Sequence, residues 1–89
     1  MKLNLRAVDL NLLTVFDALL RVQNLSRAAE ELGMSQPAVS AALSRLRLTM
    51  KDELFVRTRS GMKPTPLALP AQAPVAEALA LMAGALSSD

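Results

Sequence analysis

Residues 25–47 have the sequence LSRAAEELGMSQPAVSAALSRLR, and this stretch decides the fold. It predicts two helices joined by a short turn. Gly33 supplies the left-handed conformation that ends the first helix, and the hydroxyl of Ser35 caps the second. Ala29 is small enough to let the helices cross closely, and Val39 fills the space against the preceding helix. This spacing is typical of a helix-turn-helix.

The flanking segments predict a further helix and a hairpin. An apolar stripe over 12–20 indicates a first helix, with Asp9 as its N-cap. Asn24 or Ser26 would cap the second helix, and the third would end near residues 49–51. Residues 53–57 and 62–65 predict two strands joined by a turn, a hairpin too small to be stable unless it packs on the helices. The expected core consists of Leu12, Leu13, Phe16, Leu19, Leu20, Ala28, Ala29, Leu32, Val39, Ala42, Leu43, Leu46, Met50 and Phe55.

The composition argues against several classes of protein. The 89 residues allow one small core, and they include no Cys, His, Trp or Tyr. A disulfide scaffold and Cys or His metal sites are therefore excluded. Without His, the commonest general base near neutral pH is missing, so we expect neither an enzyme nor a cofactor. The first six residues precede no clean apolar segment, and we expect no signal peptide.

Positive charge is concentrated in the middle of the chain. The formal net charge is +2, but residues 36–66 carry six basic residues against two acidic ones. Residues 67–89 contain only Glu77 and Asp89 as charges. A local basic surface of this kind attracts a polyanion such as nucleic acid, although a solvated basic face is the alternative.

The outward face of the third predicted helix suits a DNA major groove. Its side chains are small and polar, so the helix can enter without clashing. Gln36 can pair with an adenine edge, Pro37 and Ala41 can touch a thymine methyl group, and Arg45 can meet phosphate. The hairpin tip would reach the neighbouring minor groove. The predicted DNA-binding residues are Ser35, Gln36, Pro37, Ser40, Ala41, Ser44, Arg45, Arg59 and Ser60. Two more arginines would be structural: Arg47 would pair with an acid on the first helix, and Arg57 would hold the hairpin.

The C-terminal segment predicts a helix with a coiled-coil seam. From Val75, the apolar residues Val75, Leu79, Met82 and Leu86 are spaced 4, 3 and 4 apart, as in a coiled-coil seam. Residues 67–86 also approach the length of a membrane span. Two prolines, Gln72, Glu77 and many alanines make that alternative a poor one. A helix this apolar needs a partner in water.

Residues 9–66 resemble the N-terminal DNA-binding domain of LysR-type transcriptional regulators. The similarity rests on Leu12, Phe16, LSRAAEEL at 25–32, MSQPAVS at 34–40, LSRLR at 43–47 and LFVRTRSGMKPT at 54–65. It is strongest to the branch of nodulation and aromatic-catabolism regulators. The resemblance implies a winged helix-turn-helix and an antiparallel pairing of linker helices in a dimer. It places Gln36, Pro37 and Ser40 near bases, and Arg59 and Ser60 on the wing. Pro70 departs from the family pattern and predicts a late or kinked start of the linker helix.

The combined expectation is a mainly α protein. Residues 1–65 would form a winged helix-turn-helix of three helices and a two-stranded wing, and residues 66–89 the linker helix. The family's C-terminal effector-binding domain is not in this sequence, which suggests a truncated form; a small-molecule effector would act only on a longer one. We expect a homodimer that binds a pseudo-palindromic promoter site on double-stranded DNA in the bacterial cytoplasm, at the nucleoid, without a membrane. The alternatives are a helical protein-interaction module and, less favoured, an enzyme using Asp52 and Glu53, which are consecutive and would point apart.

Overall fold

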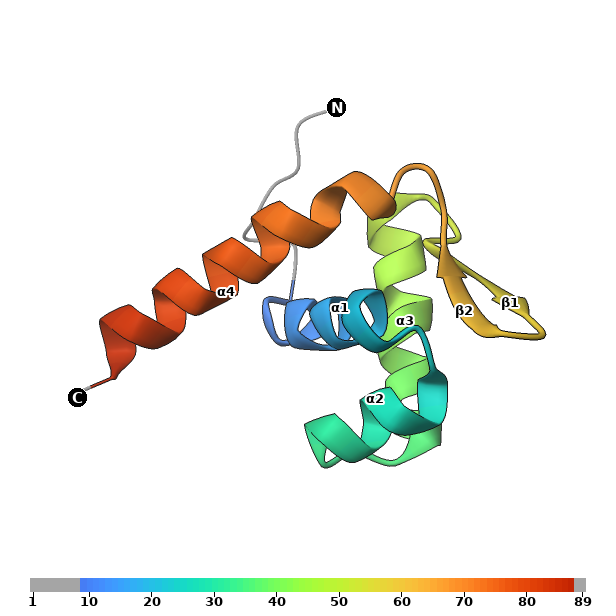
Figure 1. The fold of residues 1–89 in the computed structure, drawn as a ribbon, viewed down its shortest axis with the longest axis horizontal. Coiled ribbons are helices and arrows are strands. Elements are labelled where there is room, and N and C mark those ends of the chain that lie inside the picture. Colours follow the sequence, from blue (N-terminus) through green and yellow to red (C-terminus); the bar gives the residue numbers. More distant parts are fainter. Residues whose placement is uncertain (1–8, 88–89) are drawn as a thin grey trace.

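The computed structural model describes residues 9–87, and Figure 1 shows the arrangement of their elements. Three helices, α1 (Asn11–Val22), α2 (Leu25–Leu32) and α3 (Gln36–Met50), pack together. A wing of two strands, β1 (Phe55–Thr58) and β2 (Gly61–Pro64), follows them. A short 3-10 helix (Leu69–Ala71) then leads into α4 (Gln72–Leu86), which projects away from the other helices. The predicted mainly α, winged helix-turn-helix fold is confirmed. The N-terminal segment for which we expect no signal peptide lies outside the described residues.

Most of the helix termini lie at the residues that were predicted to cap them. Asn24 accepts a hydrogen bond from the Arg27 N–H at 2.9 Å, and Ser35 accepts one from the Ala38 N–H at 3.2 Å. Gly33 ends α2 with a φ of +66°, as predicted. The Asp9 side chain accepts from the Asn11 N–H at 2.9 Å, but Leu10 occupies the N-cap position. Asp9 therefore caps from one residue further out than predicted.

The core lies between α1, α3 and the base of the wing. Its two aromatic rings, Phe16 and Phe55, meet edge to face with centroids 5.9 Å apart. The core predictions hold except that Leu13, Leu32 and Met50 are only partly buried. Five buried residues were not predicted: Val15, Ala18, Leu54, Met62 and Ala68. Burial of Phe55 and Met62 anchors the small hairpin, which could not be stable alone.

The wing starts later than its sequence suggests. Leu54 has a φ of +65°, which breaks the extended conformation, so β1 begins at Phe55 rather than at residue 53. The strands pair antiparallel, with Phe55 opposite Pro64 and Thr58 opposite Gly61. The exposed tip of the wing is thus formed by Arg59 and Ser60.

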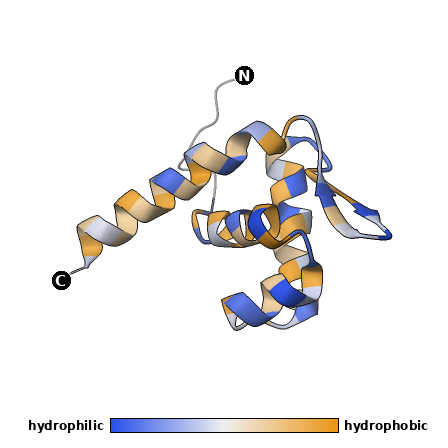
Figure 2. Ribbon diagram, viewed as in Figure 1, coloured by the Kyte–Doolittle hydropathy of each residue, from blue (hydrophilic) through white to orange (hydrophobic). Residues whose placement is uncertain are grey.

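The linker helix begins after a 3-10 turn that contains Pro70. The late start predicted from Pro70 is confirmed, since α4 begins only at Gln72. Pro74 fits into the first turn, because an N–H there would have no partner within the helix. Ala71 and Val75 pack on the core, and the Gln72 amide donates to the Leu20 carbonyl at 3.5 Å. Beyond that point α4 is mostly apolar (Figure 2), and its residues from Ala80 onward are exposed.

By length and composition, one helical stretch of the described residues, Leu69–Leu86, would be able to cross a membrane. None of it is buried in the structure. A helix that dimerises through an apolar face has the same length and composition, and in a single chain that face is exposed.

Candidate nucleic-acid interface

The outward face of α3 carries six of the predicted DNA-binding residues. The exposed side chains on this helix include Gln36, Pro37, Ser40, Ala41, Ser44 and Arg45. The Ser35 hydroxyl stabilises the first turn, and Pro37 lies within that turn. Of these six side chains, only those of Gln36 and Arg45 are long. The rest of this face is formed by short side chains, and the Gln36 amide lies at the N-terminal end of the helix.

A cleft separates the N-terminal ends of α2 and α3 from the wing. Its volume is about 280 Å³, and Gln36, Arg59 and Ser60 line it together. The structure therefore brings the predicted helix contact and the predicted wing contacts to one concave surface. Asn24, Ser26, Arg57 and Thr58 also line this cleft.

A second cleft of about 320 Å³ runs between α3 and β1. Ser40 and Ser44 line it from the helix, and Val56 and Arg57 line it from the strand. Arg57 lines both clefts, although its sequence position suggested only a structural role. Arg57 therefore contributes a positive charge to both clefts.

Ala41 and Arg45 lie on the other side of the α3 face. They line a depression of about 410 Å³ with Met34, Ala38, the N-terminal part of α1 and Asp9, which precedes that helix. The predicted DNA-binding residues thus follow α3 on both flanks. Arg45 is on the flank away from the wing.

Arg47 joins α3 to the wing rather than to α1. Its Nε donates to the Glu53 carbonyl at 2.6 Å, and its Nη2 donates to the Phe55 carbonyl at 2.9 Å. A structural role was predicted, but the predicted partner, an acid on the first helix, is wrong. Two backbone carbonyls at the entry to the wing provide the acceptors.

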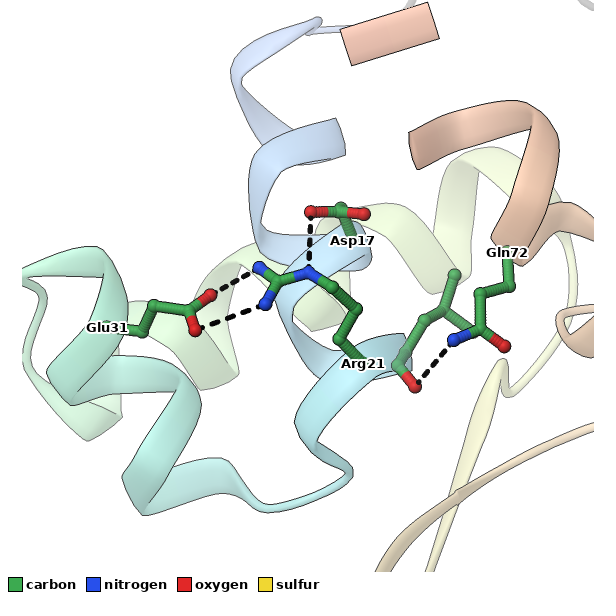
Figure 3. A network of polar contacts seen from close by, with 5 residues as sticks. Asp17, Arg21, Glu31 and Gln72 are labelled. Atoms are coloured by element: carbon green, nitrogen blue, oxygen red, sulfur yellow. Dashed lines mark hydrogen bonds and ion pairs between the residues drawn. The ribbon is translucent and has the colours of Figure 1, made fainter. Parts of the chain in front are cut away.

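The acids of α1 and α2 pair with another arginine. Arg21 bonds Asp17 Oδ2 through Nε at 3.2 Å and Glu31 Oε1 through Nη1 at 3.1 Å, and its Nη2 also meets Glu31 (Figure 3). The bonds from Arg21 lower the pKa of Glu31, and they raise the pKa of the arginine itself. This network holds α1 against α2.

Asp52 closes the base of the wing. Its Oδ2 accepts from the Thr65 hydroxyl at 2.7 Å and from the Leu54 N–H at 2.8 Å. These two bonds, the hydroxyl first, lower the pKa of the Asp52 carboxyl. Because Asp52 precedes β1 and Thr65 follows β2, one carboxylate ties the two ends of the hairpin together.

The predicted dimer seam is divided along α4. Val75 and Leu79 are partly buried, and Val75 packs on the chain's own core. Met82 is 41% exposed and Leu86 is 89% exposed. The C-terminal part of the seam is therefore free for a partner, whereas its first residue already has one. Within the described residues, no group of three His, Cys, Asp or Glu side chains could hold a metal ion.

Comparison with known proteins agrees with this architecture. The family model for "Bacterial regulatory helix-turn-helix protein, lysR family" matches residues 10–69. The chain is 51% identical over 86 residues to the transcriptional activator NagR of a Ralstonia species, covering 97% of this chain and 29% of NagR. It is 56% identical over 81 residues to the transcriptional regulator LeuO of Escherichia coli, covering 91% of this chain and 26% of LeuO.

Solved structures show the same fold. The crystal structure of a probable transcriptional regulator from Pseudomonas aeruginosa matches with a TM-score of 0.89 and 50% identity, over 92% of this chain and 28% of that one. The BenM DNA-binding domain in complex with benA site 1 DNA matches with a TM-score of 0.80 and 23% identity, over 89% and 92% of the two chains. The chain spans less than a third of the curated relatives described above.

Proposed function

The chain belongs to the LysR family of bacterial helix-turn-helix regulators, and from that premise we propose that it binds double-stranded DNA in a sequence-specific manner, as a homodimer on a pseudo-palindromic promoter site. The family's named members are transcriptional regulators and not enzymes, which agrees with the composition. Such a protein would work in the bacterial cytoplasm, at the nucleoid. In our proposal residues 1–65 form the DNA-binding unit and residues 66–89 the dimerising linker, and an effector-binding domain would belong to a longer form.

One observation carries the proposal: Gln36 at the start of α3 and Arg59 and Ser60 on the wing line the same cleft. In winged proteins of this shape, the recognition helix enters a major groove and the wing meets the adjacent minor groove. The phosphate strand between the two grooves then passes across the cleft. Arg57 and Ser26 line its path, so we add both to the proposed phosphate contacts.

The outward face of α3 supports base contact. Gln36 has the donor and acceptor pair that fits an adenine edge, and Pro37 and Ala41 offer apolar contact to a thymine methyl group. Ser40 and Ser44 are small enough to let the helix backbone approach. The DNA complex of the BenM domain supports the choice of double-stranded DNA as the partner.

The exposed apolar surface of α4 supports a homodimer. Met82 and Leu86 are exposed large hydrophobic residues in the last two turns of α4. Covering them stabilises the chain in water. An antiparallel pairing of two α4 helices would cover Met82 and Leu86 and present two recognition helices to two half-sites. The same surface would serve a heterotypic protein partner in the alternative function.

The proposal is tested by selecting genomic fragments with the purified chain at physiological salt and then by substituting two residues. Gln36→Ala is expected to lose about 1–3 kcal/mol of discrimination at one base position in each half-site, because one base contact disappears. Arg59→Ala is expected to weaken binding to all sequences more evenly and to reduce its salt dependence. Arg59→Lys keeps the charge and serves as the matched control.

Each outcome of the selection has a distinct meaning. Enrichment of a two-fold symmetric site supports the dimeric regulator. Retention of fragments that share no common sequence would mean that the chain binds DNA through charge alone. A folded sample that retains no DNA overturns the proposal and favours the protein-interaction module. An unchanged base preference in Gln36→Ala removes Gln36 from the reading residues.

A further inference from the structure

The wing contacts the corner between α1 and α2 through β2, beginning next to the tip of the wing. The Met62 N–H donates to the Gln23 carbonyl at 2.9 Å, and Lys63 Nζ donates to Gln23 Oε1 at 3.3 Å. Gln23 is the residue that ends α1, in a left-handed conformation with a φ of +50°. The residue after it, Asn24, caps α2. This corner therefore contacts the wing and starts the helix-turn-helix at the same time.

Gly61 is the residue that makes this close approach possible. A Cβ at Gly61 would overlap the Gln23 carbonyl oxygen and lie 3.4 Å from its carbonyl carbon. Both obstacles are backbone atoms, which cannot rotate away as a side chain can. Gly61 also has a φ of +127°, a region that residues with a side chain rarely adopt.

Gly33 provides an internal comparison. It too has a positive φ, +66°, but a Cβ placed there would meet nothing within 4 Å. Replacing Gly33 with Ala would therefore strain the backbone without pushing two elements apart. Replacing Gly61 with Ala would strain the backbone and would also push the wing away from Gln23.

Short hydrogen-bonded links connect Gly61 to the tip of the wing. Thr58 pairs with Gly61 across the hairpin and donates through Oγ1 to the Gly61 carbonyl at 3.0 Å. The same oxygen accepts from the Ser60 N–H at 3.3 Å. A tip built in this way moves with Gly61, because no flexible segment separates Arg59 and Ser60 from it.

We propose that the contact of Gly61 and Met62 with the Gln23 carbonyl sets the angle between the wing and α3, and thereby positions Arg59 and Ser60 for the DNA next to the α3 site. Gly61 is a positioning residue: it touches no DNA itself. The inference rests on the proposed DNA binding for its consequence. The contact on which it depends is a property of the free chain and can be tested without DNA.

The first test is amide hydrogen exchange on the free chain. The Met62 amide of the wild type is expected to exchange at least tenfold more slowly than the Ser60 amide at the tip, because its bond to the Gln23 carbonyl joins β2 to the α1–α2 corner. In Gly61→Ala, protection of Met62 is expected to disappear. In the matched control, Gly33→Ala, it is expected to remain. Equal exchange of Met62 and Ser60 in the wild type would overturn the docking contact, whether or not the variant folds.

The second test is footprinting on a DNA fragment that the wild type selects. Gly61→Ala is expected to lose about tenfold in affinity, the size of one charge-assisted contact, and to lose protection only in the flanking minor groove. Protection of the central major-groove bases is expected to persist. Gly33→Ala, compared at equal folded fraction, is expected to keep both regions.

A double variant separates positioning from general damage. If Gly61 acts through the tip, Gly61→Ala combined with Arg59→Ala is expected to bind no more weakly than the weaker of the two single variants. Full additivity, or an unchanged flanking footprint in Gly61→Ala, would overturn the inference. If the wild type binds no DNA, the proposed function fails. The exchange result then still decides whether the wing is docked through Gly61.

Discussion

Arg47 shows what a single side chain contributes to this fold. Its guanidinium satisfies the carbonyls of Glu53 and Phe55 at the entry to the wing. Arg47→Ala leaves both carbonyls without this donor, so we expect a loss of about 1–3 kcal/mol in the free energy of unfolding. Arg47→Lys is expected to recover only part of it, because an ammonium lacks the planar fork that reaches two acceptors. Urea unfolding measures both values.

Arg45, two residues before Arg47, provides the control. Arg45 is exposed, so Arg45→Ala is expected to change the free energy of unfolding by less than about 0.5 kcal/mol. Wild-type stability in Arg47→Lys would show that charge alone, and not the fork, supports the wing.

At the level of residues, sequence reasoning succeeded where neighbours along the chain decide the outcome. The caps at Asn24 and Ser35 and the left-handed Gly33 depend on local geometry. Ser35 and Gly33 were predicted, and Asn24 was one of two predicted candidates. The partners of Arg47 and Glu31 depend on how elements meet, and spacing along one helix carries no such information. The site gained Ser26 and Arg57 for the same reason: only the folded chain brings them beside Gln36.

At the level of elements, α4 supports a prediction about self-association. Met82→Lys is expected to weaken the dimer strongly, because it places a charge in the free part of the seam. Leu81→Lys is the matched control: Leu81 is 69% exposed but points about 100° away around the helix. Sedimentation equilibrium of both variants gives the two dissociation constants. Equal weakening would mean that the interface uses a different face of α4.

The periodicity of α4 predicted a buried stripe but could not assign its partner. The same 4, 3, 4 spacing lets Val75 pack on the chain's own core and leaves Leu86 exposed. An apolar stripe on a helix indicates that another surface covers it, but not which surface. The wing illustrates a related gap, since nothing in its sequence indicates the positive φ of Leu54 that delays β1.

At the level of the whole molecule, two carboxylates link separate elements and make stability depend on pH. Glu31 joins α2 to α1, and Asp52 joins the two ends of the wing. Their pKa values are lowered in the folded chain, so the stability that they add is fully present above the ordinary carboxyl range. It is lost as the pH falls from about 4 through the lowered values, because the unfolded chain binds protons first.

Thermal unfolding at a series of pH values checks this dependence. The wild-type midpoint is expected to stay level from about pH 7 to pH 5 and to drop below about pH 4. Asp52→Asn is expected to start lower and to drop less steeply, because one of the titrating links is already gone. A variant curve parallel to that of the wild type would show that Asp52 contributes nothing to the acid sensitivity.

The order of elements and the fold class could be predicted for the whole described chain, because each element has its own local pattern. The angles between elements could not. The wing angle depends on the contact of Gly61 with Gln23, two residues with no shared motif. The direction of α4 depends on how Ala71, Gln72 and Val75 meet α1 and the core.

The small side chains on the outward face of α3 have a consequence for redesign. A helix with its side chains is about 10–12 Å across and the major groove about 12 Å wide, so steric clearance is narrow. In the proposed complex, Ser40, Ala41 and Ser44 would provide that clearance. A bulky residue at any of them would act as a spacer that lifts the whole helix and removes every base contact together. New sequence preferences are therefore better sought at Gln36 and at the wing tip, where longer side chains already have room.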